Sequence, residues 1–124
     1  MFEGLSTSTS RESVSFEVSI SYDNKEFLGT SAIDTNEQNE NYLNVVEATV
    51  LALREIQKSF RVEYLDIVQY GLTKILICVC SANINGTRIK SVSADFFNDS
   101  KLENVVMCII ESMNKIFSKI EKRR

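Results

Sequence analysis

The sequence contains no histidine and no proline. Histidine is the commonest general base and metal ligand in proteins, so its absence excludes Ser-His and Cys-His nucleophile arrangements. Without proline, no helix or strand is interrupted from within. No apolar run approaches the ~18 residues of a membrane-spanning helix. These absences argue against histidine-based catalysis and against a membrane span.

Cysteine is scarce, and the three residues form no C-x-x-C pair. Cys78 and Cys80 are expected on one side of a strand, and together with Cys108 they are expected to be small core residues rather than zinc ligands. An odd cysteine count without a signal peptide is typical of a reducing cytoplasm. We therefore expect a cytoplasmic protein with no metal and no cofactor.

The 124 residues, 44% of them apolar, are enough for one domain with one core. The net charge of −3 argues against broad nucleic-acid binding, which draws on a basic excess. Basic residues gather only near the C-terminus, where cations also favour a helix end. Hydrophobic patterning predicts an α+β domain over 13–120. A disordered Ser- and Thr-rich tail is expected at 1–12, and a basic tail at 121–124.

Two kinds of periodicity appear within the domain. Alternation of apolar and polar residues predicts a strand at 14–20, and further strands are predicted at 27–33, 61–70, 74–82 and 87–95. The strand at 74–82 is apolar on both sides. Asn85-Gly86 predicts a type I′ turn between the last two strands. Helices are predicted at 41–58, with Asn44 and Glu47 in capping-box positions, and after a second capping box at Ser100 and Glu103.

The two halves form a weak internal repeat. Residues 14–34 align with 75–95, which places Asp34 on Asp95, and the two helical segments align after them. The predicted order is a ββα-βββα pseudo-repeat, an antiparallel sheet with two helices packed on one face.

The last helix has more apolar surface than one contact needs. An apolar seam recurs every third or fourth residue from Leu102, and further apolar residues widen it well beyond ~100°. Either the first helix covers the second face within the chain, or a second copy does. The homodimer is the favoured interpretation. The expected interface residues are Val105, Ile109, Ile110, Met113 and Phe117.

Several local strings resemble one family. The strings are "NVVEATVLAL", "VEYLDI", "TRIKSVSAD" and "SMNKIF". Over residues 13–117 the chain resembles the C-terminal regulatory domain of 2-isopropylmalate synthase and its citramalate synthase relatives. The matching positions are Val46, Glu47, Ala48, Leu65, Asp66, Val92, Ser93 and Asp95. The resemblance implies a pair of βββα-like units that dimerise and bind a feedback amino acid beside the strand-to-helix loops. The catalytic barrel is missing, so the chain is not expected to be an enzyme.

The strand-to-helix loops carry most of the candidate ligand-binding groups, because free N–H groups at helix starts attract anions. The resemblance adds Glu47 and Asp66, and Arg88 on a strand could supply charge. The candidates are Asn41, Tyr42, Asn44, Glu47, Asp66, Arg88, Ser93, Asp95, Phe96, Phe97 and Asn98. The Phe96-Phe97 pair either anchors its loop to the core or stacks on a ligand ring. The favoured hypothesis is a non-catalytic dimer that senses or sequesters an anionic metabolite, amino acid or nucleotide.

Three alternatives stay open. The element order also occurs in ribosome hibernation factors, which would imply RNA or ribosome binding, although the net charge argues against it. A structural protein-interaction module is the second. Catalysis is the third and weakest, because Asp34, Asp66 and Asp95 lie at strand ends or turns, where aspartate is expected for structural reasons.

Overall fold

The computed structural model describes residues 2–9, 13–34, 41–98 and 100–122. Within them the order is βββα-βββα, which confirms the α+β class. The elements are β1 (Phe2–Thr9), β2 (Ser13–Tyr22), β3 (Lys25–Asp34), α1 (Asn41–Ile56), β4 (Arg61–Tyr70), β5 (Thr73–Ile84), β6 (Thr87–Phe96) and α2 (Glu103–Lys122).

The first strand corrects the predicted disordered tail at 1–12. Phe2–Thr9 forms β1, which pairs antiparallel with β2 and places Leu5 opposite Val18. Backbone pairing rather than apolar alternation holds this Ser- and Thr-rich strand, so the hydrophobic pattern did not reveal it. Residues 10–12 lie outside the described residues. At the other end α2 continues to Lys122, so the predicted boundary at residue 120 lies inside a helix.

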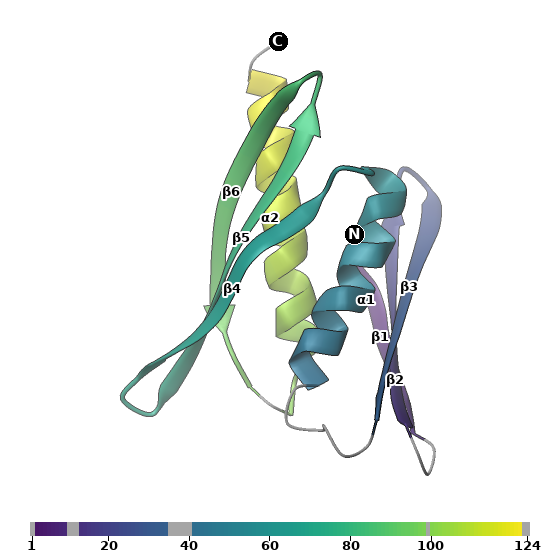
Figure 1. Cartoon of the computed structure of the whole chain (residues 1–124), viewed down its shortest axis with the longest axis vertical. Helices are drawn as coiled ribbons and strands as arrows, with labels where there is room; N and C mark the ends of the chain where they lie inside the picture. Colours follow the sequence, from purple (N-terminus) through teal and green to yellow (C-terminus); the bar gives the residue numbers. More distant parts are fainter. Residues whose placement is uncertain (1, 10–12, 35–40, 99, 123–124) are drawn as a thin grey trace.

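The strands form two three-stranded antiparallel sheets, β1-β2-β3 and β4-β5-β6, instead of a single sheet. Figure 1 shows the two helices side by side between the sheets, with α1 on β2 and β3 and α2 on β5 and β6. The inner face of each sheet is therefore covered by a helix. The outer face of each sheet points away from the helices.

Tight turns join the strands within each sheet. Asn85 and Gly86 have φ values of 52° and 83°, the left-handed conformation at both central positions that a type I′ turn requires. This confirms the predicted hairpin. Asp23 and Asn24 make the equivalent turn between β2 and β3, with φ values of 54° and 62°.

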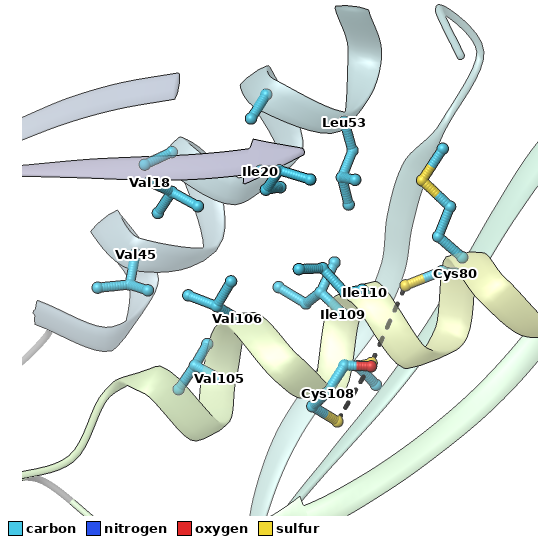
Figure 2. Close-up of a cluster of buried hydrophobic side chains, with 14 of the residues drawn as sticks. Val18, Ile20, Val45, Leu53, Cys80, Val105, Val106, Cys108, Ile109 and Ile110 are labelled. Carbon is cyan, nitrogen blue, oxygen red and sulfur yellow. Dashed lines mark hydrogen bonds between the residues drawn. The ribbon is translucent and has the colours of Figure 1, made fainter. Parts of the chain in front are cut away.

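The second apolar face of α2 is covered by the same chain. Ile109, Ile110 and Met113 are each no more than 3% exposed. Figure 2 shows the apolar side chains of α2 directed toward Ile20 of β2 and Leu53 of α1. The first helix and first sheet therefore take the place that the sequence assigned to a second copy.

The predicted dimer interface on α2 is consequently wrong for Val105, Ile109, Ile110 and Met113, because side chains buried inside one chain cannot also contact another. Phe117 is half-buried, and its ring lies 5.8 Å from that of Tyr22 in β2. It too has an intramolecular partner.

Both predicted capping boxes are also wrong. The helix α2 begins at Glu103, and the Ser100 hydroxyl donates a hydrogen bond to Asn98 Oδ1 at 2.7 Å instead of capping the helix. The helix α1 begins at Asn41, so Asn44 and Glu47 lie inside its first two turns.

Candidate functional site

The start of α1 and the segment that follows β6 bring some of the predicted ligand residues together. The rings of Tyr42 and Phe97 meet edge to face with their centroids 5.5 Å apart. Phe97 is only 9% exposed, so it anchors its segment to the core, one of the two roles expected for the Phe96-Phe97 pair. Asn41 Oδ1 is buried and has no hydrogen-bond partner among the described residues. Asn98 is engaged in its own turn, where its Oδ1 accepts from the Ser100 backbone N–H at 2.9 Å.

Two other predicted residues make internal contacts, and a third is buried. The Ser31 hydroxyl in β3 lies 3.0 Å from Asn44 Oδ1 and 3.1 Å from Glu47 Oε2, which ties α1 to its sheet. Ser93 is 2% exposed, and its hydroxyl lies in the core without a hydrogen-bond partner among the described residues. A ligand in solvent does not reach it.

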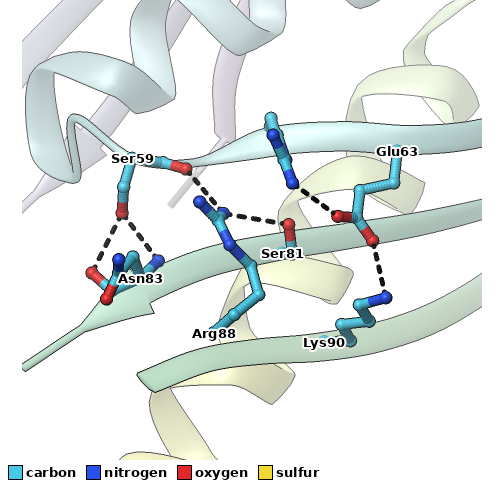
Figure 3. A network of polar contacts seen from close by, with 7 residues as sticks. Ser59, Glu63, Ser81, Asn83, Arg88 and Lys90 are labelled. Carbon is cyan, nitrogen blue, oxygen red and sulfur yellow. Dashed lines mark hydrogen bonds and ion pairs between the residues drawn. The ribbon is translucent and has the colours of Figure 1, made fainter. Parts of the chain in front are cut away.

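The remaining predicted residues belong to the second sheet. Arg88 donates to Ser59 O at 3.2 Å and to Ser81 Oγ at 3.1 Å, so it fastens the loop before β4 to the sheet (Figure 3). Asp66 and Asp95 each accept a hydrogen bond from the next backbone N–H at 2.8 Å. The predicted ligand-binding residues therefore do not assemble into one site.

One apolar surface among the described residues has no partner, the outer face of the β4-β5-β6 sheet. Side chains of β5 alternate between two apolar sides, with Leu76, Cys78 and Cys80 buried under α2 and the next residues directed outward. The outer face comprises Tyr64, Val68, Ile75, Ile77, Val79, Val92, Ala94 and Phe96. The sequence carried the signal for it, because the segment at 74–82 is apolar on both sides.

Several side chains of this outer face remain in solvent. Tyr64 is 54% exposed, Val92 56% and Phe96 66%. The strand register places Tyr64, Val79 and Val92 in one row across the sheet. Near the β4-β5 turn, a shallow hollow of about 220 Å³ is lined by Ile75, Ala94, Asp95 and Phe96. A contiguous apolar surface of this kind is typical of a protein interaction site.

Charges of opposite sign lie on either side of the row formed by Tyr64, Val79 and Val92, which we call the central row. We call the position of a row along the strands its level. At the level on one side of the central row, Glu63 pairs with Arg61 at 3.0 Å and with Lys90 at 3.4 Å (Figure 3). Desolvation opposes ionisation of this carboxyl, but hydrogen bonds from Arg61, Ser81 and Lys90 outweigh it and hold its pKa below the usual value. Two cations against one carboxylate leave this level positive.

The negative charge lies on the other side of the central row. The Tyr64 hydroxyl donates to Asp66 Oδ2 at 3.0 Å. This hydrogen bond, together with the charge of the carboxylate, raises the pKa of Tyr64 above its usual value of 10.0. The exposed carboxyl group of Asp66 therefore lies beside the apolar row.

Both edges of this sheet carry features that oppose strand addition. On β6, Lys115 Nζ of α2 donates to Val92 O at 2.7 Å, and Lys119 Nζ donates to Lys90 O. On β4, the register shifts between Val62 and Tyr64, an irregularity of the β-bulge type. Capped carbonyls and bulges oppose edge pairing, so the outer face is the more accessible surface for association.

The three cysteines gather between β5 and α2. Cys78 Sγ lies 3.6 Å from Cys108 Sγ and 3.9 Å from Cys80 Sγ, and all three side chains are fully buried. The hydrogen bond to Cys78 and burial raise the pKa of Cys80 and of Cys108. The expectation of core thiols is confirmed. Across residues 2–9, 13–34, 41–98 and 100–122, no group of three or more acidic or cysteine side chains is placed to hold a metal ion.

No helix in the described part of the chain is long and apolar enough to cross a membrane. Neither a protein-family model nor a curated protein matches this sequence. The resemblance to the 2-isopropylmalate synthase regulatory domain therefore stays a prediction.

Proposed function

We propose that this chain is a non-catalytic association domain that pairs with a second copy of itself through the outer face of the β4-β5-β6 sheet. The observation that carries the proposal is the row of Tyr64, Val79 and Val92, an apolar centre that no described helix or strand covers. Apolar side chains gain roughly 25 cal/mol per Å² when they leave water. A face-to-face pairing would provide that burial.

The size of the face is compatible with a small dimer interface. Three strands ~4.8 Å apart and about ten residues long present roughly 450 Å². The β4-β5 turn extends this area, because Tyr70 is 81% exposed and Leu72 is fully exposed. A specific interface needs about 1,000 Å² in total, or about 500 Å² from each partner. Two copies of this surface reach that limit.

A second copy suits the surface for two reasons. Two twisted three-stranded faces can pack on each other, and such faces lie about 10 Å apart in sandwiches. The face also carries positive charge on one side of the apolar row and negative charge on the other. These charges can pair with those of a second copy whose strands run in the reverse direction.

Sedimentation equilibrium tests the proposal. We expect a reversible dimer for the native chain and a monomer for Val92→Glu, because a carboxylate in the middle of the interface would lose its hydration. Leu28→Glu is the matched control, since Leu28 is an exposed strand residue of the other sheet. It should leave the dimer intact. A native chain that stays monomeric, or a dimer that tolerates Val92→Glu, would overturn the proposal.

Binding of a small anionic ligand that also carries a hydrogen-bond donor, such as an amino acid, is a second candidate function. It is supported by the contact of Tyr42 at the start of α1 with Phe97, and by the buried Asn41 Oδ1, an acceptor that has no partner among the described residues. A thermal-shift screen of amino acids, 2-oxo acids, nucleotides and cyclic dinucleotides tests it. A ligand at 100 times its Kd stabilises the fold by about 2.7 kcal/mol. Asn41→Ala should remove the shift, whereas Asn98→Ala should not. No shift with any compound would remove this candidate.

A further inference from the structure

We propose that the two copies are related by a two-fold axis that crosses the strands at the row of Tyr64, Val79 and Val92, so that Asp66 of each copy faces Arg61 of the other. This inference rests on the proposed self-association. It assigns the orientation of the partner, which an apolar surface alone leaves open.

The strand register defines the levels of charge on the face. Arg61 and Lys90 lie in one row with Ser81 of β5 between them, and Asp66 lies in the row of Ile77. Val79 is two residues from Ser81 and two from Ile77, so the central row is midway between the positive and negative levels. Each level is ~7 Å from the centre, because a strand rises about 3.3 Å per residue.

A face-to-face dimer has two simple orientations. If the axis crosses the strands at Val79, each strand lies over its own copy in the reverse direction. The positive level then lies over the negative level, and Arg61 meets Asp66 because both belong to β4. The contact occurs twice by symmetry, while Val79 of one copy lies over Val79 of the other.

The alternative axis runs along the strands and is opposed by the same charges. It places β4 over β6 without reversing direction, so that Arg61 would lie over Lys90 on both sides of the axis. Like charges opposed across an interface weaken association. Edge-to-edge pairing is blocked by the lysines that cap the carbonyls of β6 and by the bulge in β4. The charge pattern therefore selects the crossing axis.

Charge reversal tests the predicted contact. Asp66→Arg should raise the dimer Kd by about tenfold or more at low salt, because it places two cations together at both copies of the contact. Adding Arg61→Asp should restore the Kd to within about threefold of the native value, since the pair is then reversed. Glu17→Arg on the other sheet makes the same change in net charge and should have little effect.

Cysteine cross-linking distinguishes the two axes independently of charge. Val79→Cys should give a covalent dimer with a short bismaleimide, because its two copies meet on the axis. Thr73→Cys, on the same side of β5, should not cross-link, because its copies lie ~40 Å apart when the strands run in reverse. The native cysteines are buried and provide little background reaction.

The outcomes separate this orientation from the proposed function. Cross-linking at both positions, or an unchanged Kd in Asp66→Arg, would overturn the crossing axis. If Val92→Glu still dissociates the dimer, self-association through this face would stand. A native chain that remains monomeric at all concentrations would overturn both.

Discussion

Gly29 of β3 lies directly against Ala48 of α1, so closely that a β-carbon at position 29 would overlap the Ala48 carbonyl oxygen. The first helix therefore rests on bare backbone at this point of the first sheet. This contact sets how close α1 lies to the first sheet. Because α1 also packs on the second apolar face of α2, the contact helps to set the position of the residues that bury that face.

Gly29→Ala is expected to destabilise the fold by about 2–3 kcal/mol, because the helix must move away from the strand. Urea unfolding followed by circular dichroism measures the change. Gly4→Ala is the control, since a β-carbon at Gly4 in the same sheet meets nothing within 4 Å. Equal losses in the two variants would contradict the close approach.

Ile110→Glu should unfold the chain instead of separating two copies. Ile110 of α2 is buried in the hydrophobic core, and a carboxylate at this position would lose its hydration without gaining a partner. The expected loss is about 4 kcal/mol or more in the free energy of unfolding. Met107→Glu, an exposed change on the same helix, should be nearly neutral. A folded, monomeric Ile110→Glu protein would restore α2 as the interface.

Removing both lysines that cap β6 should promote association beyond the dimer. Lys115→Ala combined with Lys119→Ala frees the carbonyls of Val92 and Lys90 for pairing with another strand. Light scattering at increasing concentration should show larger species. The same loss of charge in Lys58→Ala with Lys101→Ala leaves the edge capped, so that variant should resemble the native chain.

Asp66→Asn should lower the pKa of Tyr64 toward 10.0, because the hydrogen bond and the negative charge that raise it are weakened or lost. Because the pKa of Tyr64 is raised in the folded state, the contact adds to the free energy of unfolding at pH values below the unfolded-state pKa. This contribution is lost as the pH rises through the folded-state pKa. NMR titration of labelled tyrosine in the monomeric Val92→Glu background measures the shift. Glu17→Gln should leave Tyr64 unchanged. An unchanged pKa in Asp66→Asn would contradict the contact.

Local patterns in the sequence predicted most elements of the fold. Local sequence patterns revealed five of the strands, helical periodicity revealed both helices, and Asn85-Gly86 predicted its turn. These features depend on residues close in sequence, so they can be recognised without the tertiary structure. The strand β1 could not be found in this way, because its pairing with β2 rather than its own composition makes it a strand.

Most of the candidate ligand residues were predicted from the loops to which they belong, and the three-dimensional placement of the side chains dispersed the candidates. Phe96 and Phe97 are adjacent in the chain, yet Phe96 is exposed and Phe97 is buried against Tyr42. Arg88 and Ser93 lie on opposite faces of β6, so they cannot serve one pocket. Alternation along a strand separates neighbours, and only the packed structure shows what each one meets.

The sequence by itself determined that two segments carry apolar residues on two sides, namely the last helix and the strand at 74–82. Only the tertiary structure decided which of these surfaces is covered within the chain. The first sheet and α1 bury the second face of α2, while no described element covers the outer face of β5. Burial is set by contacts between residues far apart in sequence, so periodicity shows that a face is apolar but not what lies against it.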